Sequence, residues 1–399
     1  MRLPKGYCYS GIVSGIKASG KKDLALIVSE VPARAAAVLT TNRVKAAPLV
    51  VCQERQKRGL GQAVIINSGN ANAGTGPQGL RDAREMVRQV SQALHIPPSL
   101  VWVASTGKIG EFLPMNLVKK GITQAAQRLS PSRYKEAATA ILTTDRGPKI
   151  SLRQGGVGKI KYSLLGMAKG AGMIMPQMTL TGHATLLCFL QTDLTMASST
   201  LKRLLKSCVD RTFNVISVDG DTSTNDMVLI LANGRAGNIS FKKNSPLYRQ
   251  FEKKLLEVCH ELALMMVRDG EGATKVVRLE VKGARNHTEA QKIVRTVGNS
   301  LLVKTAFFGG DPNWGRLVAA AGRAGVPFHP HKLDLFYDQV LLVQKGVLKN
   351  SMAERRAKKI AKKNSFGVIL DLHAGPGRAI LYSSDLGHNY VQLNSKYRT

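Results

Sequence analysis

The sequence predicts an α/β or α+β protein in which sheets are buried between layers of helices. Short apolar runs, bounded by Gly, Asn and Pro, alternate along the chain with amphipathic segments of helical period. The 399 residues, 44% of them hydrophobic, suffice for two domains or for one large unit with a sizeable core. The chain contains no low-complexity linker and no fixed-period repeat.

The first elements expected are strands, because four short runs combine apolar and β-branched residues between turn-forming ones. These runs are DLALIVSE (23–30), AAAVLTT (35–41), PLVVCQE (48–54) and AVIINSG (63–69). A helix is expected next, over residues 77–96, because apolar side chains recur there at helical spacing. That stripe consists of Leu80, Ala83, Met86, Val87, Val90 and Leu94.

The same two patterns continue through the remainder of the chain. Amphipathic periodicity predicts three further helices, at residues 114–129, 196–209 and 245–267. Apolar runs predict strands at residues 100–106, 214–221, 227–234, 275–283, 333–346 and 366–375. The run ATLLCFLQTD, which begins at Ala184, is also typical of a buried strand.

The composition is strongly basic, with 58 Lys and Arg against 26 Asp and Glu and a net charge of +32. Such a charge attracts anions and supports non-specific binding to nucleic acid. The densest run, AERRAKKIAKKNS, nevertheless predicts an amphipathic helix with a solvated face, whose apolar side is Ala353, Ala357, Ile360 and Ala361. Aromatic residues make up only 5%, too few for a stacking platform, so no specific nucleic-acid partner is expected.

Cysteine usage and hydropathy indicate the compartment. The five cysteines are widely spaced and form no C-x-x-C, so reduced thiols are expected rather than a disulfide frame or a structural zinc site. No apolar run is long enough for a membrane span, and the N-terminal sequence has no apolar core typical of a signal peptide. We therefore expect a cytoplasmic protein that does not bind membranes.

Several common catalytic patterns are absent, or they occur without the neighbouring residues that their function requires. Gly74, Gly76 and Gly79 form a literal G-x-G-x-x-G, but the first lies seven residues beyond AVIIN and no acidic residue follows at the ribose-binding distance. A structured loop and helix start is the better interpretation. The chain has neither G-x-S-x-G nor H-E-x-x-H, and His329 and His331 are best explained as polar surface, so no metal is expected.

A threonine nucleophile is the chemistry that remains. Seven clusters of Gly with Asn, Asp, Ser or Thr occur at element ends: INSGNANAG, ASTGKIG, LTTDRGPK, SVDGDTSTND, RDGEGATK, FFGGDPNWGR and NSKYRT. Cleavage before Thr185 would expose an α-amino group, with a pKa of about 7.7–8, as the base for its own hydroxyl. The small residue Ala184 before it permits that attack, and Thr106 with Gly107 offers a hydroxyl and an N–H for an oxyanion hole.

At these residues the sequence resembles the ornithine acetyltransferase / glutamate N-acetyltransferase family of arginine biosynthesis, which cuts itself at an internal Ala-Thr bond. The shared motifs run in family order through nearly the whole chain. They are PKGYCYSGIVSGIKASGKKDLALIVSE, TTNRVKAAPLVVCQE, INSGNANAGTG, ASTGKIG, TTDRGPK, MAKGAGMI, VDGDTSTND, VRDGEGATK, LVKTAFFGGDPNWGR and HNYVQLNSKYRT.

The resemblance implies a fold of the N-terminal-nucleophile type, shared with certain aminopeptidases, with layered sheets and a smaller C-terminal domain. It also implies that self-cleavage divides the chain into residues 1–184 and residues 185–399, and that two copies of each fragment form a tetramer. The motifs TTD, DGEGATK and NSKYRT favour the acetyltransferases over the aminopeptidases of the related fold.

Residue roles follow from the resemblance in the same way. Thr185 would be the nucleophile, and Thr106 with Gly107 the oxyanion hole. The contacts to the amino-acid substrate would come from Thr143 or its neighbour Thr144, Lys169, Thr185, Glu271, Asn394 and Thr399. Lys169 is suited to a substrate carboxylate, whereas Glu271 is suited to an ammonium group or to proton transfer.

The reaction that the resemblance implies is a ping-pong transfer without metal or dissociable cofactor. N2-acetylornithine gives its acetyl group to Thr185, ornithine leaves, and glutamate takes the acetyl group. Some members of the family also use acetyl-CoA as donor, and the sequence leaves that alternative open.

One departure from the family pattern lies beside the expected cleavage bond. The residues TLTGH, 179–183, lengthen the segment between Lys169 and Thr185 by five positions. Gly182 permits a loop that bulges outward and keeps the bond in place. An insertion that displaced the bond would prevent the cut, so a non-cleaving homologue with a binding or regulatory role is the alternative hypothesis. A polyanion-binding protein is the third hypothesis.

Overall fold

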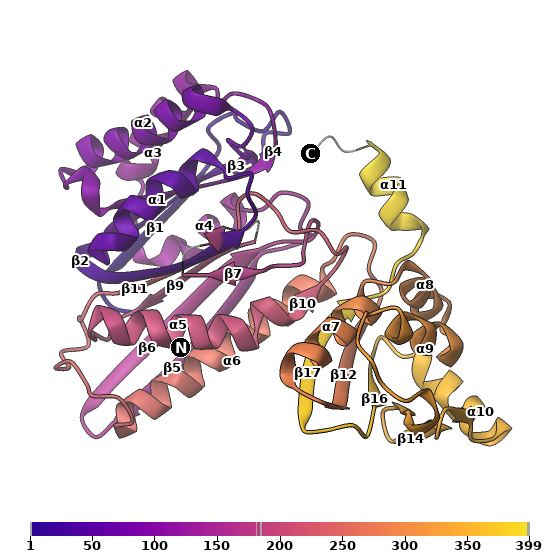
Figure 1. The fold of residues 1–399 in the computed structure, drawn as a ribbon. Helices are drawn as coiled ribbons and strands as arrows, with labels where there is room; N and C mark the ends of the chain where they lie inside the picture. The colour runs from indigo at the N-terminus through magenta and orange to yellow at the C-terminus, as the bar shows by residue number, and fades with distance from the viewer. Residues whose placement is uncertain (1, 181, 184–185, 397–399) are drawn as a thin grey trace. The chain divides into compact units, whose positions relative to one another are not determined.

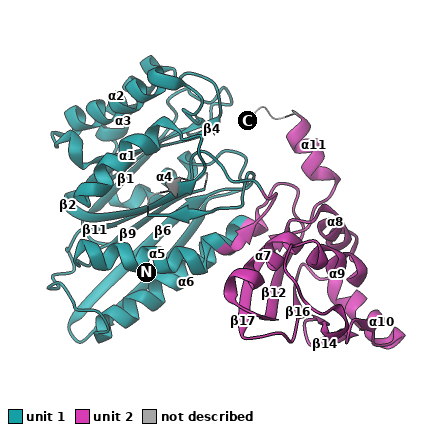
Figure 2. Cartoon of the chain, viewed as in Figure 1, with its two compact units in different colours: residues 1–214, 221–266, 399 teal, residues 215–220, 267–398 magenta. Residues whose placement is uncertain are grey.

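Two compact units make up the computed structural model, which describes residues 2–180, 182–183 and 186–396 (Figure 2). Within these residues, unit 1 runs to Asn214 and resumes from Asp221 to Met266. Unit 2 takes Val215–Gly220 and continues from Val267. Each unit has its own sheet, so the predicted layered α/β class with a smaller C-terminal domain is confirmed.

A large mixed sheet forms the centre of unit 1, with the strand order β4-β3-β2-β11-β9-β6-β5. Its strands are β2 (Leu24–Thr41), β3 (Leu60–Asn70), β4 (Val101–Lys108), β5 (Lys149–Val157), β6 (Ile160–Lys169), β9 (Leu187–Thr192) and β11 (Met227–Ala232). Three more strands pair with β2 and are β1 (Tyr7–Ile12), β7 (Met178–Thr179) and β8 (Gly182–His183). Strand β2 is therefore the organising strand of this unit.

Helices cover both faces of this sheet (Figure 1). They are α1 (Ala47–Arg58), α2 (Gly76–Leu94), α3 (Met115–Gln127), α4 (Tyr134–Ala140), α5 (Ser198–Arg211) and α6 (Pro246–Arg268), with short 3-10 turns at Pro98–Leu100, Pro131–Arg133 and Phe213–Val215. All six residues of β9 are buried, as expected for a strand covered on both sides. The strand predicted directly after Thr185 is thus confirmed.

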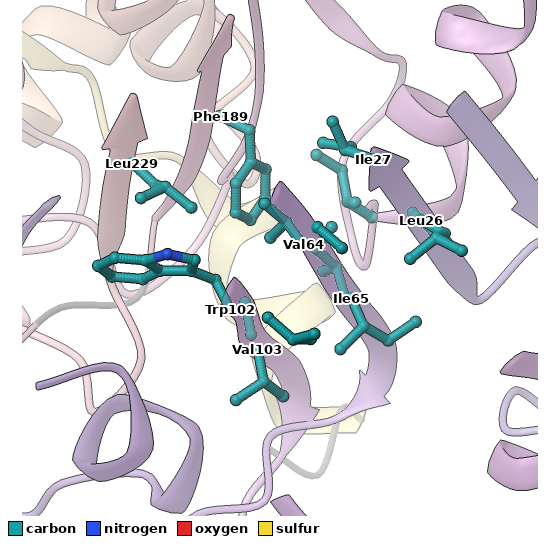
Figure 3. Packing of buried hydrophobic residues seen from close by; sticks show 14 of the residues in the cluster. Leu26, Ile27, Val64, Ile65, Trp102, Val103, Phe189 and Leu229 are labelled. Atoms are coloured by element: carbon teal, nitrogen blue, oxygen red, sulfur yellow. The ribbon is translucent and has the colours of Figure 1, made fainter. Parts of the chain in front are cut away.

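The core of unit 1 gathers apolar side chains from adjacent strands (Figure 3). Val64 and Trp102 of β3 and β4 belong to the same cluster as Phe189 and Leu229 of β9 and β11. The indole N–H of Trp102 donates to the Leu60 carbonyl at 3.0 Å, which satisfies its one polar atom. Burial on this scale is the main stabilising contribution to the unit.

Unit 2 has a second sheet, in the order β10-β17-β12-β16-β13-β14-β15. Its strands are β10 (Ile216–Ser217), β12 (Val276–Ala284), β13 (Asp334–Tyr337), β14 (Val340–Gln344), β15 (Val347–Leu348), β16 (Ser365–Asp371) and β17 (Gly377–Ser384). Its helices are α7 (His287–Gly298), α8 (Leu301–Gly309), α9 (Trp314–Gly322), α10 (Ser351–Ala361) and α11 (His388–Lys396), with a 3-10 turn at Pro330–Lys332.

Most predicted elements are present, and one is wrong. Residues 48–54, predicted as a strand, lie in helix α1, which has Pro48 in its first turn and ends at Gly59 with φ of 62°. A short apolar run cannot be assigned by periodicity alone, and here the flanking Pro and Gly mark a helix.

Four of the predicted strands differ clearly in extent from the structure. The runs 23–30, apart from Asp23, and 35–41 belong to the single strand β2, whose pairing with β3 shifts register between Val28 and Ala33, around Pro32. Residues 214–221 contribute only the short strand β10. Residues 333–346 form the β13–β14 hairpin.

The basic run predicted as a solvated helix is α10. Ala353, Ala357 and Ala361 are buried on one side of this helix, and Ile360 is partly buried beside them. Its basic residues are largely exposed, which confirms the amphipathic pattern.

Candidate active site

The segment that follows the expected cleavage bond enters the middle of the unit 1 sheet. Leu187, the first residue of β9, pairs with Lys169 of β6 on one side and with Met227 of β11 on the other. Ala184 and Thr185 lie outside the described residues. Leu186, the next residue in the chain, is buried, and its carbonyl accepts from the Met227 amide at 2.6 Å.

Two of the predicted site residues meet in this region. Lys169 Nζ donates a hydrogen bond to Thr106 Oγ1 at 3.1 Å, and both side chains are almost completely buried. A hydroxyl that accepts from a cation still has its own proton to donate, and the charge makes it a stronger donor. Thr106 is therefore suited to donate to a developing negative charge.

Gly107 follows Thr106 at a point where β3 and β4 approach closely. Its φ is +135°, and a Cβ atom there would lie 2.3 Å from the Gly69 carbonyl carbon. The parallel pairing of β3 with β4 also becomes irregular from Gly69 onward. Only glycine fits this position, and its backbone is held where the ladder is interrupted.

A network of buried polar side chains supports this irregular end of β3 and β4. Asn225 donates to the Ala71 and Ser105 carbonyls at 2.7 and 2.9 Å, and thereby joins the chain after β3 to β4. Ser105 in turn donates to Asn67 Oδ1 at 2.5 Å. Such networks hold one backbone geometry, and the motifs INSGNANAG, ASTGKIG and VDGDTSTND supply the side chains.

Asp145 is a central residue of the site for which no role was predicted. Its carboxylate accepts from Lys149 Nζ at 2.6 Å, from the Gly170 amide at 2.7 Å and from the Thr143 amide at 3.1 Å. Burial by itself raises the carboxyl pKa, but the positive charges of Lys169 and Lys149, with these hydrogen bonds, lower the pKa to about 2. Asp145 therefore links the Thr143 loop to the chain beside Lys169.

Lys17 is a second residue without a predicted role. Its ammonium donates to the Leu142 and Lys22 carbonyls at 2.6 and 2.9 Å, directly before Thr143. Burial lowers the pKa of Lys17 to about 8, and the charge of Lys169 acts in the same direction. Both missed residues lie in quoted motifs, but sequence spacing alone does not identify their contacts.

Unit 2 brings together two other predicted substrate residues. Asn394 Nδ2 donates to Glu271 Oε2 at 2.9 Å, although 123 residues separate the two in the chain. Gly272 makes the approach of α11 possible, because a Cβ atom there would lie 2.5 Å from the Tyr390 backbone nitrogen. Thr399, the last predicted contact, lies outside the described residues.

The predicted residues thus form two groups, one in each unit. Unit 1 has the contact between Thr106 and Lys169, with Thr143 tied to Lys169 through Asp145. Thr144 is partly buried beside Thr143. Unit 2 has the contact between Glu271 and Asn394.

The residues that depart from the family pattern do not form an outward loop where they are described. Met178 and Thr179 pair antiparallel with Thr40 and Leu39, and Gly182 and His183 pair in parallel with Thr40 and Thr41. The expectation that Gly182 lets the segment bulge away is therefore wrong, since backbone pairing with β2 holds these positions. Thr181 lies outside the described residues.

Within residues 2–180, 182–183 and 186–396, no group of three His, Cys, Asp or Glu side chains is suited to hold a metal ion. None of the helices described there combines the length and the apolar character that crossing a membrane requires. All five cysteines are free thiols, and four of them are buried.

Comparison with known proteins shows which family and which relatives this chain is similar to. The sequence pattern of the ArgJ family matches residues 8–399. The arginine biosynthesis bifunctional protein ArgJ of Geobacter sulfurreducens is 46% identical over 395 residues, which cover 99% of each chain. The glutamate N-acetyltransferase of Methanocaldococcus jannaschii is 43% identical over 398 residues, covering 96% of this chain and 97% of the relative.

A solved structure is also similar to part of the chain. The ornithine acetyltransferase of Mycobacterium tuberculosis, in complex with ornithine, is 39% identical and covers 44% of this chain and 94% of its own, with a TM-score of 0.40.

Proposed function

The chain belongs to the ArgJ family, and on this basis we propose that it transfers the acetyl group of N2-acetylornithine to glutamate in arginine biosynthesis. Relatives of the same length and more than 40% identity carry the names of bifunctional ArgJ and glutamate N-acetyltransferase. It is an acyltransferase, with N2-acetylornithine and glutamate as its small-molecule substrates.

Thr185 is the proposed nucleophile. During maturation its Oγ attacks the Ala184 carbonyl carbon, the peptide bond breaks, and water hydrolyses the resulting ester. The new α-amino group then serves as base, taking the hydroxyl proton as Oγ attacks the acetyl carbonyl of N2-acetylornithine. That proton passes to the leaving amine of ornithine, and an acetyl ester remains on Thr185.

The second half of the reaction reverses these proton movements. The amine of glutamate attacks the acetyl ester and loses a proton, the bond to Thr185 Oγ breaks, and N-acetylglutamate leaves. Thr106 Oγ1 and the Gly107 N–H are the proposed donors to the oxyanion of each tetrahedral intermediate. The observation that carries this proposal is the buried hydrogen bond from Lys169 to Thr106, which polarises the hydroxyl and makes it a stronger donor.

The remaining residues are proposed substrate contacts. Lys169 and the loop of Thr143 and Thr144 are assigned to the substrate carboxylate, because Lys169 supplies a cation and the Thr residues supply hydroxyls. Glu271 and Asn394 are assigned to ammonium and amide groups of the substrate, and their mutual contact supports a shared role. Thr399 is assigned to the same set by the resemblance alone.

Several finer features complete the proposal. The mature enzyme is a tetramer of two fragments 1–184 and two fragments 185–399, and it needs no metal or dissociable cofactor. Acetyl-CoA is an alternative acetyl donor for glutamate. A cytoplasmic location is consistent with five free cysteines, which suit a reducing compartment.

Intact mass followed by acetyl loading tests the proposal. Purified protein should give two fragments, the second beginning with Thr185. That fragment should gain the mass of one acetyl group when N2-acetylornithine is added without glutamate, and lose it when glutamate follows. A Thr185→Ala chain should remain whole and unacetylated. An uncut wild-type chain without transferase activity would contradict the proposal and favour a non-cleaving binding protein.

A further inference from the structure

Gln56 of α1 completes one edge of strand β2 beside the segment that precedes the cleavage bond. The Ala35 amide donates to the Gly59 carbonyl at 2.9 Å, and the Thr41 amide donates to the Gln177 carbonyl at 3.0 Å. Between them, the Gln56 carboxamide accepts from the Ala37 amide at 3.2 Å and donates to the Ala37 carbonyl at 2.9 Å. The Gln56 side chain therefore makes the two hydrogen bonds that the backbone of a neighbouring strand would make with Ala37.

The same carboxamide reaches the five-residue insertion. Gln56 Nε2 also donates to the Leu180 carbonyl at 2.6 Å, and Leu180 is the second residue of TLTGH. The backbone of Gln56 is itself held, because its carbonyl accepts from Lys202 Nζ of α5 at 3.3 Å. One half-buried side chain thus joins β2, helix α1 and the insertion.

A second carboxamide fixes the chain just before the insertion. Asn214 accepts from the Met178 amide and donates to the Met178 carbonyl, both at 2.9 Å. Asp210 orients Asn214 in turn, because its carboxylate accepts a hydrogen bond from Asn214 Nδ2 at 2.9 Å. The backbone is therefore held at Met178 by Asn214 and at Leu180 by Gln56, and Gly182 pairs with β2 beyond them.

From these contacts we propose that Gln56 is a positioning residue for self-cleavage, acting through Leu180 to hold the insertion on β2. The inference rests on the proposed function, because it concerns the bond between Ala184 and Thr185. Five extra residues lengthen the reach of the segment by several ångströms, so the scissile carbonyl needs a new anchor to remain in one place. Gln56 supplies that anchor before cleavage and has no part in acetyl transfer afterwards.

The experiment measures the rate of self-cleavage and the transferase activity of cleaved enzyme separately. Precursors of the wild type, Gln56→Ala and Gln56→Glu are produced in a cell-free system and followed by intact mass. Glu has the shape of Gln and still accepts from the Ala37 amide, but it cannot donate to the Leu180 carbonyl or to the Ala37 carbonyl. Both variants should cleave about tenfold more slowly, because Gln56→Glu loses two oriented hydrogen bonds and Gln56→Ala loses three.

Two controls separate positioning from a general effect on folding. Gln62→Ala removes another side-chain amide that donates to a β2 carbonyl, that of Glu30 at 3.4 Å, far along the strand from the insertion. This variant should cleave at the wild-type rate. In a chain that lacks residues 179–183, the Leu180 acceptor is gone, and Gln56→Ala should then change the cleavage rate less than twofold.

The outcomes divide clearly between the inference and the function on which it rests. Slow cleavage of both Gln56 variants, normal activity per cleaved molecule, and loss of the effect without the insertion would support the inference. Unchanged cleavage of the Gln56 variants, or an equal defect without the insertion, would overturn it and leave the proposed function intact. A wild-type chain that never cleaves would overturn both.

Discussion

Lys169 connects the two parts of the unit 1 site, because its ammonium contacts Thr106 directly and its charge acts on Asp145. Lys149 provides the natural comparison, since it donates to the same carboxylate at 2.6 Å. The contact of Lys169 with Thr106 reaches a residue of the proposed oxyanion hole. The two lysines therefore allow catalysis to be separated from support of the carboxylate.

Replacing Lys169 with Met should lower kcat/KM for acetyl transfer by about 100-fold, because a charge-assisted hydrogen bond to Thr106 is lost. Steady-state kinetics of the cleaved variant measures this effect. Lys149→Met is the matched control and should lose less than tenfold. Equal losses in the two variants would show that support of Asp145, not the Thr106 contact, explains the effect.

Asp145 should contribute to stability in a defined pH window. Its folded pKa of about 2 lies below the ordinary value of 3.8, so its contribution is complete above about pH 4 and is lost as the pH falls toward 2. The side chain is fully buried, and Asp145→Asn should lower the free energy of unfolding by about 2 kcal/mol at pH 7.

Urea unfolding of unit 1 checks this prediction. The chain has two tryptophans, Trp102 in unit 1 and Trp314 in unit 2. A Trp314→Phe background leaves Trp102 fluorescence as the reporter of the transition in unit 1. The difference between Asp145→Asn and its parent should be constant from pH 7 to about pH 5 and shrink below pH 4. A difference that does not change with pH would contradict the role of ionised Asp145.

At the scale of elements, the junction of β3 and β4 is the feature on which the site depends. Two glycines with positive φ, Gly69 and Gly107, face each other where the pairing becomes irregular. Asn225 stabilises the same junction by donating hydrogen bonds to two backbone carbonyls, those of Ala71 and Ser105. The elements of the sheet therefore supply a rigid base for the proposed oxyanion donors.

Gly107→Ala should destabilise unit 1 by about 2–3 kcal/mol and abolish rapid self-cleavage, because the new Cβ meets the Gly69 backbone. Gly110→Ala is the matched control, since Gly110 also has positive φ, +82°, but no atom lies within 4 Å of its added Cβ. This variant should lower the free energy of unfolding of unit 1 by about 1 kcal/mol and should still cleave rapidly. Trp102 fluorescence and intact mass measure the two effects. Similar behaviour of both variants would show that strain alone, not the close approach, matters.

In unit 2, helix α11 carries the partner of Glu271. Glu271→Gln keeps an acceptor for Asn394 but removes the charge. We expect kcat/KM to fall about 10- to 100-fold with little change in stability, because only an interaction with a cationic group is lost. Glu354→Gln, on the exposed side of α10, is the control and should have no effect. Normal kinetics of Glu271→Gln would remove this residue from the proposed site.

At the scale of the whole molecule, a net charge of +32 should produce non-specific binding to polyanions. Binding of the protein to a random DNA duplex, followed by fluorescence anisotropy, should weaken by orders of magnitude between about 50 and 200 mM salt. Acetyl transfer measured at the higher salt should be the same with and without DNA. Sequence-dependent DNA binding that persists at high salt would instead indicate a specific nucleic-acid function.

Several features of this protein follow from its sequence alone. Amphipathic periodicity predicted helices α2, α3, α5, α6 and α10, and apolar runs predicted the central strands, because local burial patterns repeat with the period of the element. The motif set identified the family, since many ordered motifs rarely coincide by chance. The helix α1 was misassigned because an apolar run of seven residues has too little periodicity to distinguish helix from strand.

Only the tertiary structure decided which distant residues meet. Thr106 lies 63 positions from Lys169, and no local pattern encodes the sheet register that brings them within 3.1 Å. The same holds for the contact of Asp145 with the Gly170 amide, 25 positions away, and for Gln56, whose carboxamide reaches an insertion 124 positions away. Strand pairing and the satisfaction of buried polar groups are properties of the assembled sheet, so they fix these contacts only when the whole unit folds.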